Sequence, residues 1–263
     1  MARYTEQSRG TFLYEISKGN VFGHYPVIVA GHNDNCLAAT PQQYIWSPGG
    51  SYIFTTVGET VSIVSTSSED DATPGGTGWR TCFIEGLDEN YNEISEFLSL
   101  EGLTPVNTQN EYIFISEIHA IAPGCSVGST GVNQGDIIGT GNTSGKTFFQ
   151  VDTGAGINQQ CFGVVPAGKS LLIVDFQFFS QKLGGGQAPD IELNAFAQPH
   201  GLGKFKGLEA TIETEVNGRF DFEFRVPFVA YEKSCWWVEV VTTHDATQVH
   251  GIVQGFHVDN DKI

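Results

Sequence analysis

The sequence predicts an all-β protein made of antiparallel sheets, arranged as a jelly-roll-like β-sandwich. Glycine and phenylalanine are abundant, with 32 glycines and 19 phenylalanines in 263 residues, a composition that suits short strands joined by tight turns. Apolar and polar residues alternate with a period of two in about ten segments, and none shows a convincing helical repeat. Many short alternating segments separated by turns are typical of sandwiches and jelly rolls.

The chain divides into four parts by composition. Residues 1–37 mix glycines with short apolar patches and predict an extended N-terminal arm that lies across a neighbouring surface. Residues 38–123 predict a first β-unit. Residues 124–145 are glycine-rich and predict a loop or a boundary between units. Residues 146–263 predict a second, jelly-roll-like unit, and two stacked β-units are the alternative to a single sandwich.

Individual strands follow from the alternation. In the first unit, Trp79–Glu85 and Tyr91–Leu100 flank the turn-rich segment Gly86–Asn90 and predict an antiparallel pair. In the second unit, Ser170–Phe179 predicts a long strand with one buried face. The residues expected on that buried face are Leu172, Val174, Phe176 and Phe178.

The most regular alternation predicts a hairpin. Leu208–Val216 and Arg219–Val226 each alternate apolar and charged residues. A three-residue loop with Gly218 in the left-handed conformation would place the apolar faces of the two strands together. This register pairs Ile212 with Phe222.

The net charge and the lack of a secretory signal limit the classes of partner that we expect. Thirteen basic and 30 acidic residues give a formal net charge of −17, which repels a phosphate backbone and argues against nucleic-acid binding. One interpretation of the negative charge is that it keeps the protein soluble and prevents edge-to-edge aggregation of strands. The alternative is that the acidic residues dock on a basic scaffold or gather divalent cations. The sequence lacks a secretory signal and an apolar run of the roughly 20 residues that span a bilayer. We therefore expect synthesis in the cytoplasm and no membrane contact.

The cysteines predict buried free thiols. Their number is odd and their spacing is wide, without a C-x-x-C pair that would indicate zinc or a redox dithiol. The five cysteines are Cys36, Cys82, Cys125, Cys161 and Cys235.

Three patterns in the sequence resemble ligand sites. Gly141–Thr147 ends like a phosphate-binding loop, but Thr140 stands where the first glycine belongs and the flanks are strands, so no nucleotide site is predicted. Three tail histidines form no H-x-H pair, and three acidic turns lack the spacing of a calcium loop, so no metal site is predicted. These residues are His244, His250 and His257, and Glu69–Asp71, Asp88–Asn90 and Asp259–Asp261.

The pair Trp236–Trp237 has two interpretations. Adjacent residues of a strand face opposite sides, so one indole is expected in the core and the other in a subunit contact or in solvent. An exposed indole could stack on a sugar. No G-x-S-x-G motif or distinctive carboxylate pair is present, so the sequence predicts no catalytic, cofactor-binding or metal-binding residues and no enzyme.

Six motifs carry a family resemblance over most of the chain. They are GNVFGHYP, YIWSPGGSYIF, GTGWRTCFIEGLDENYNEISEFLSLEGLTPV, VPAGKSLLI, YEKSCWWVEV and GFHVDND. As a set they resemble uncharacterised structural (virion) proteins of tailed bacteriophages, many of them marine or cyanobacterial. The resemblance implies a particle component with no catalytic residues to carry over.

The resulting expectation is a bacteriophage virion structural protein, a capsid decoration or head-fibre component on the outer surface of the particle. It would assemble as a homo-oligomer, a trimer, and contact the major capsid protein, with tail proteins as the alternative partner. A tail-associated adhesin that binds a host glycan is the second hypothesis. A cupin-like or depolymerase enzyme is the third.

Overall fold

The computed structural model describes residues 9–38, 40, 42–73, 76–123, 131–183, 190–213 and 217–262, with the side chains of 9–11, 123 and 208–217 excepted. One α-helix, α1 (Arg9–Ser17), and a 3₁₀ turn, η1 (Asn260–Lys262), accompany the strands. The strands are β1 (His24–Cys36), β2 (Gln43–Tyr44), β3 (Val61–Ser65), β4 (Trp79–Leu87), β5 (Glu93–Ser99), β6 (Val106–Asn107), β7 (Phe114–Pro123), β8 (Ile137–Gly141), β9 (Thr147–Val151), β10 (Phe162–Val164), β11 (Lys169–Lys182), β12 (Asp190–Gln198), β13 (Phe205–Glu213), β14 (Asn217–Ala230), β15 (Cys235–Thr242) and β16 (Thr247–Asp259).

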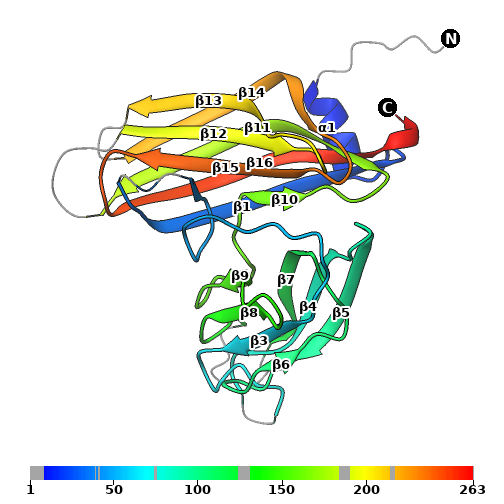
Figure 1. The fold of residues 1–263 in the computed structure, drawn as a ribbon, viewed down its shortest axis with the longest axis vertical. Coiled ribbons are helices and arrows are strands. Elements are labelled where there is room, and N and C mark those ends of the chain that lie inside the picture. The colour runs from blue at the N-terminus through cyan, green and yellow to red at the C-terminus, as the bar shows by residue number, and fades with distance from the viewer. Residues whose placement is uncertain are drawn as a thin grey trace.

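The strands form two bodies, a larger one above a smaller one in Figure 1. The larger body has one sheet of order β1-β16-β11-β14 and a second of order β10-β15-β12-β13, with β2 also pairing with β15. Every strand pair in these sheets is antiparallel. The predicted all-β antiparallel architecture is therefore confirmed.

The pairing of the larger body is that of a jelly roll. Its eight main strands form nested pairs, in which the first strand in the chain pairs with the last, the second with the second-to-last, and so on. These pairs are β1 with β16, β10 with β15, β11 with β14 and β12 with β13. The pairs β11–β16 and β12–β15 then join this folded ribbon into two sheets. A long antiparallel ribbon wrapped in this way is the jelly-roll arrangement.

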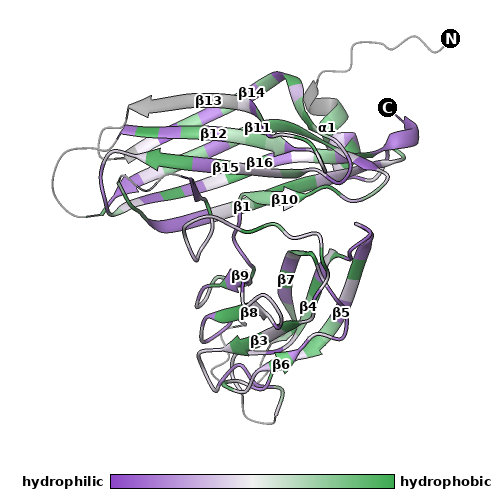
Figure 2. Cartoon of the chain, in the orientation of Figure 1, coloured by the Kyte–Doolittle hydropathy of each residue, from purple (hydrophilic) through white to green (hydrophobic). Residues whose placement is uncertain are grey.

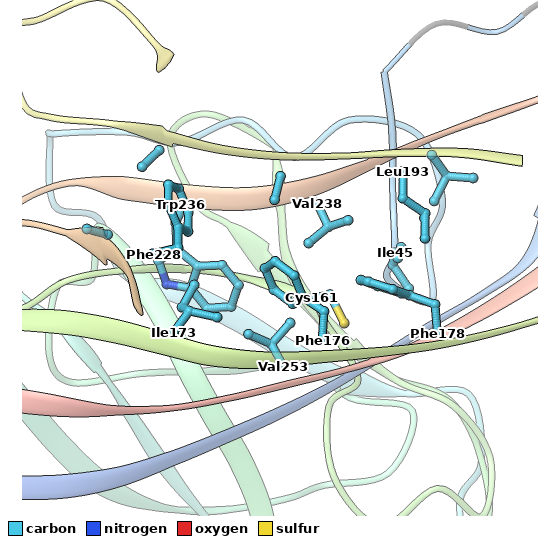
Figure 3. Packing of buried hydrophobic residues seen from close by; sticks show 14 of the residues in the cluster. Ile45, Cys161, Ile173, Phe176, Phe178, Leu193, Phe228, Trp236, Val238 and Val253 are labelled. Atoms are coloured by element: carbon cyan, nitrogen blue, oxygen red, sulfur yellow. The ribbon is translucent and has the colours of Figure 1, made fainter. Parts of the chain in front are cut away.

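Apolar side chains fill the space between the two sheets. Phe176, Phe178, Trp236 and Val253 are all at most 3% exposed and belong to one cluster. Figure 3 shows these side chains pointing toward one another from facing strands. Along strands such as β12 and β16 the hydropathy alternates in Figure 2, because successive side chains face opposite sides of a sheet.

The smaller body is inserted between β1 and β10. It consists of a sheet of order β6-β3-β8-β9 and a sheet of order β5-β4-β7. The predicted antiparallel pair is confirmed as β4 and β5, with Phe83 opposite Phe97. A separate apolar cluster, which includes Trp79 and Phe148, lies inside this body.

Aromatic side chains join the two bodies. The shared cluster takes Leu87, Tyr91 and Phe114 from the smaller body, and Phe196 and Trp237 from the larger. The segment between β2 and β3 adds Trp46 and Tyr52, whose ring lies 4.5 Å from that of Phe162. Burying large aromatic surfaces stabilises the contact, so the smaller body is held against the jelly roll.

The structure corrects the predicted N-terminal arm and unit boundaries. Residues 24–36 form β1, which pairs with β16 along its length, and α1 packs its Ile16 against Phe256 on the outer face of the same sheet. Residues 137–141 and 147–151 are strands of the smaller body. The predicted boundary within 124–145 therefore does not separate the bodies, and residues 124–130 of it lie outside the described residues.

The predicted hairpin is also wrong. Ile212 lies opposite Ile191 on β12, whereas Phe222 lies opposite Phe176 on β11. The two strands thus belong to different sheets of the sandwich. Each strand has a chemically suitable partner elsewhere in the chain, and the closure of the jelly roll selects those partners.

A β-bulge divides the predicted buried face of β11. The register shifts between Ile173 and Asp175, so Phe176 and Phe178 face the core, as predicted, but Leu172 and Val174 face α1 on the opposite side. An extra residue in one strand reverses the alternation that follows it.

Among the described residues, no helix is both long and apolar enough to cross a bilayer.

Candidate binding cleft between the two bodies

A cleft of about 490 Å³ lies where the two bodies meet. One wall is β1, from Tyr25 to Ala30, which runs along the lower side of the jelly roll in Figure 1. Strands β4 and β7 of the smaller body form the opposite wall. Lys169 and His257 of the jelly roll close one end. We call this space the edge cleft, because it follows the free edge of β1.

The two linkers between the bodies close the other end of the edge cleft. The backbone N–H of Gln160 donates to the carbonyl oxygen of Ala30 at 2.8 Å. A Cβ added to Gly31 would lie 2.4 Å from the carbonyl oxygen of Ile45 and 2.5 Å from the nitrogen of Cys161. Glycine at position 31 therefore lets both linkers cross close to β1, and it fixes where the cleft ends.

Carboxylates dominate the charge of the cleft. Glu85, Glu93 and Glu117 line it, and the Lys169 ammonium lies 2.6 Å from the carboxylate of Glu93. Burial raises the pKa of Glu85, and the charges of Glu117 and Glu93 raise it further. In the described part of the chain, no donor hydrogen-bonds the Glu85 carboxylate. The cleft thus holds a half-buried acid whose pKa is raised by burial, and the positive charges of Lys169 and His119 offset this increase only in part.

His257 contributes little positive charge to the cleft. Burial lowers its pKa to about 4, and the positive charge of Lys169 acts in the same direction. An ordinary histidine has a pKa of 6.5 and becomes cationic as the pH falls below that value. His257 instead stays neutral until the pH approaches 4. Among the described residues that line the cleft, three carry carboxyl groups and Lys169 carries an ammonium, and the His119 ring lies 2.6 Å from one of these carboxyl groups, that of Glu117.

A second group of charges ties the bodies together beyond the linkers. His32 of β1 lies 2.6 Å from Asp34 and 3.5 Å from Asp152, which follows β9. The hydrogen bond to Asp152 raises the pKa of His32, partial burial opposes it, and Asp34 adds to the increase. The His32 ring also stacks on that of His250 at 4.6 Å.

The segment that resembles a phosphate-binding loop holds a carboxylate of the protein itself. It forms the turn between β8 and β9, where the N–H groups of Thr143 and Ser144 donate to Glu59 at 2.7 and 2.9 Å. Burial opposes ionisation of Glu59, but these hydrogen bonds and the Ser144 hydroxyl outweigh it and lower its pKa. The site where an anion would bind is occupied by Glu59.

The structure separates the tail histidines. His250 and His257 are seven residues apart on β16 and so face opposite sides of the sheet. His244 lies in the loop before β16 and bonds through its ring to Thr243. Within the described residues, no group of three or more histidine, cysteine or acidic side chains is arranged to hold a metal ion.

The acidic turns have structural roles. Asp70 is fully buried and accepts hydrogen bonds from backbone N–H groups. Asp88 accepts the N–H groups of Asn90 and Asn92, both at 2.8 Å, which shapes the turn before β5. Asp261 pairs with Lys262 at the chain end.

The two adjacent tryptophans face opposite sides, as predicted, but both are buried. Trp236 lies in the jelly-roll core at 3% exposure, and Trp237 lies in the aromatic cluster between the bodies at 4%. The Trp237 ring stacks between those of Tyr44 and Phe196 at 5.9 and 5.5 Å. Neither indole is available to stack on a glycan, so the sugar-stacking interpretation of this pair is wrong.

The cysteines match the prediction where they are described. Cys36, Cys82 and Cys161 are buried free thiols, and Cys235 is a partly buried one. Burial raises the pKa of Cys36, Cys82 and Cys235 to about 12. Cys125 lies outside the described residues.

Sequence reasoning did not single out the residues of the edge cleft. Glu85, Glu117 and Lys169 come from β4, β7 and β11, and each reads in the sequence as an ordinary polar position of a strand. The one local signal is Pro26, because proline within a strand indicates an edge.

No family model and no curated protein matches the chain. Among solved structures, the chain is similar to that of the infectious bursal disease virus Gt strain, with 7% identity and a TM-score of 0.25 over 92% of this chain and 74% of that one. It is similar to the infectious bursal disease virus VP2 subviral particle with 8% identity and a TM-score of 0.23, over 90% of this chain and 72% of that one. Both TM-scores are too low for the likeness to bear on the function of this chain.

Proposed function

We propose that this chain is a non-enzymatic structural protein of a bacteriophage particle, a capsid decoration or head-fibre component that acts by assembling on the particle surface. The observation that carries the proposal is the packing of the jelly roll. Its interior is filled with apolar side chains such as Phe176, Phe178 and Trp236. Jelly rolls serve in capsids, lectins and cupins. A cupin site needs polar ligands inside the barrel, whereas this interior is apolar, so the surfaces remain for function.

Two further observations support the proposal. The motifs that resemble phage structural proteins map onto both bodies, since the longest covers β4 and β5 and others cover β11, β15 and β16. The aromatic cluster between the bodies holds them in one arrangement, which suits a component that transmits contacts rather than one that opens for a substrate. The net charge of −17 disfavours a role on the packaged genome.

Assembly as a homo-oligomer, with a trimer as the expected state, belongs to this proposal. Several large apolar side chains are exposed on both bodies, including Phe97 at 66% and Val226 at 79%. Light scattering of the purified protein over a dilution series measures the state. A monomer at all concentrations would contradict the oligomer without affecting the particle role.

The test of the particle role is to locate the chain on particles. Gold-labelled antibodies against the purified protein are expected to mark the heads, and a particle reconstruction should show density that fits the jelly roll with its inserted body. Label confined to tails would favour the adhesin hypothesis. Particles without label would refute the proposal. Deleting residues 1–37 is not a suitable test, because it removes β1 from the larger sheet.

A further inference from the structure

Among the described residues, no strand pairs with the edge of β1 that lines the edge cleft. β1 pairs with β16 on one side only. The carbonyl of Ala30 points away from β16, since it accepts the N–H of Gln160. Backbone groups alternate along a strand, so those of Ile28 and Pro26 point the same way. Among the described residues, none hydrogen-bonds the backbone of Ile28 across this edge.

Pro26 is consistent with this geometry. Its position shares the parity of Ala30, so a residue other than proline would direct its N–H into the cleft rather than to β16. Proline is accepted in edge strands at such positions, because no ladder hydrogen bond is lost. Ile28, whose side chain is 72% exposed, therefore offers both an N–H and a carbonyl to the cleft.

The opposite wall of the cleft differs from β1, because side chains of the chain itself already hydrogen-bond the backbone of β7. The side chain of Asn158 accepts the N–H of Ile118 at 3.0 Å and donates to the carbonyl of Ser116 at 3.2 Å. The side chain of Gln160 donates to the carbonyl of Ile115 at 3.1 Å. The linker before β10 thus caps β7, and β1 is left as the edge that can accept another strand.

The size and charge of the cleft specify what would pair there. Its volume of about 490 Å³ lies within the roughly 300–1,000 Å³ typical of ligand clefts. Glu85 and Glu117 lie opposite each other on β4 and β7. In the described part of the chain no donor hydrogen-bonds the Glu85 carboxylate, whereas the Glu117 carboxylate lies 2.6 Å from the His119 ring. A basic side chain would compensate these acids, whereas an acidic one would add to the repulsion.

We propose that the edge cleft binds an extended segment of a partner protein, which pairs with β1 as an additional strand and places a lysine or arginine beside Glu85 and Glu117. Strand addition supplies affinity through main-chain hydrogen bonds, and the acids supply selectivity. The inference stands apart from the particle role, because it concerns the cleft and not where the protein is located.

The probe is a short synthetic peptide of alternating threonine and lysine, titrated against the full chain at low ionic strength. We expect it to bind, and a threonine–glutamate peptide of equal length to bind at least tenfold more weakly. Methylating the peptide nitrogens that face β1 should weaken binding to a similar extent, because it removes the donors of the new ladder without changing the charge. Hydrogen exchange at the Ile28 amide should slow when the peptide is bound.

Two pairs of variants separate strand addition from general attraction to an acidic protein. Ile28→Pro removes the free N–H and should weaken binding about tenfold, whereas Ile28→Thr keeps it and should bind normally. Glu85→Gln should weaken binding several-fold, whereas Glu89→Gln, on an exposed turn of the same body, should have no effect. Thermal denaturation confirms that each variant is folded.

The results that would overturn the proposal are equally specific. Absence of binding at millimolar peptide would exclude the site. Equal affinity of the methylated and unmethylated peptides would exclude strand addition, even if Ile28→Pro failed to fold. An equal loss of peptide affinity in Glu85→Gln and Glu89→Gln would show that the peptide responds only to the overall charge of the protein.

Discussion

The two bodies are both β-sandwiches with an apolar cluster inside, but they differ in how their buried backbone groups are satisfied. In the jelly roll, β11 and β14 are each 14 residues long and β16 is 13, and the core between the sheets is apolar. In the smaller body, β3, β8 and β9 are only five residues long. Short strands leave more backbone groups outside the sheet ladders, and those groups need other partners when they are buried.

Buried polar side chains supply these partners in the smaller body. The Asp70 carboxylate, 0% exposed, accepts the N–H groups of Trp79, Gln134 and Gly135 and the hydroxyl of Ser65. Asn133, 1% exposed, donates to the carbonyl oxygens of Gly135 and Asp152, both at 2.8 Å. The Glu59 carboxylate accepts the N–H groups of Thr143 and Ser144 in the turn between β8 and β9.

The comparison shows how one chain stabilises sheets of different length. Long strands satisfy most of their own backbone, so their interior needs few polar side chains, such as Thr242 and Thr247. Short strands depend on a few polar hubs that each hold several loops, and the loss of one hub affects several hydrogen bonds at once. The two bodies should therefore respond differently to substitution.

The largest effect is expected in the jelly-roll core. Phe176→Ala removes a fully buried ring from the centre of the apolar cluster and should lower the free energy of unfolding by about 3–5 kcal/mol. Urea denaturation measures the loss. Val226→Ala, on an exposed side chain of the same sheet, serves as the control and should change stability little. A loss below about 1 kcal/mol in Phe176→Ala would mean that the core is not packed as described.

The second effect concerns the polar hub of the smaller body. Asp70→Ala leaves four donors without their acceptor and should cost about 3 kcal/mol, with Asp70→Asn costing less because one oxygen remains. Hydrogen exchange should increase at the amides of Trp79 and Gly135 but not in β11. Glu101→Ala, on an exposed side chain of the same body, should leave exchange unchanged. Equal acceleration in both bodies would show that the hub does not act locally.

The third effect is a dependence on pH that comes from His257. Its pKa is lowered from 6.5 to about 4, so between these values the unfolded chain binds a proton that the folded chain does not. Stability should therefore fall as the pH drops from about 6.5 to 4, by roughly 3 kcal/mol at most. Denaturation of the wild type and His257→Gln across this range isolates the contribution. Parallel pH profiles for the two proteins would contradict it.

The smallest effect is expected for the ion pair between the bodies. Lys169→Met breaks the contact with Glu93, whose side chain is 44% exposed, so water screens the pair and the loss should be about 0.5 kcal/mol or less. Thermal denaturation measures it, with Lys262→Met at the exposed chain end as the control. A loss of several kcal/mol would mean that this pair, rather than the aromatic cluster, holds the bodies together.

The candidate site could not be predicted from the sequence. Glu85, Glu117 and Lys169 lie on three strands that meet only after the smaller body is inserted between β1 and β10. Pro26 marks an edge strand locally, but the space beside that edge exists only because the second body stands opposite it. A half-buried acid without a donor is a property of the assembled cleft and not of the segment around Glu85.

By itself, the amino-acid sequence determined the strand character of its most regularly alternating segments. The predicted strands Trp79–Glu85 and Ser170–Phe179 lie within β4 and β11, because a half-buried sheet requires side chains to alternate between core and water. The aromatic and glycine content likewise determined the all-β class.

Only the tertiary structure decided which strands pair and where the bodies begin. Pairing is decided by contacts between residues far apart in the chain, as when Ile212 pairs with Ile191 instead of Phe222. A single bulge in β11 was enough to move Leu172 and Val174 to the opposite face. The physical reason is that local alternation describes one strand, whereas burial of both sheets must be satisfied by the whole chain at once.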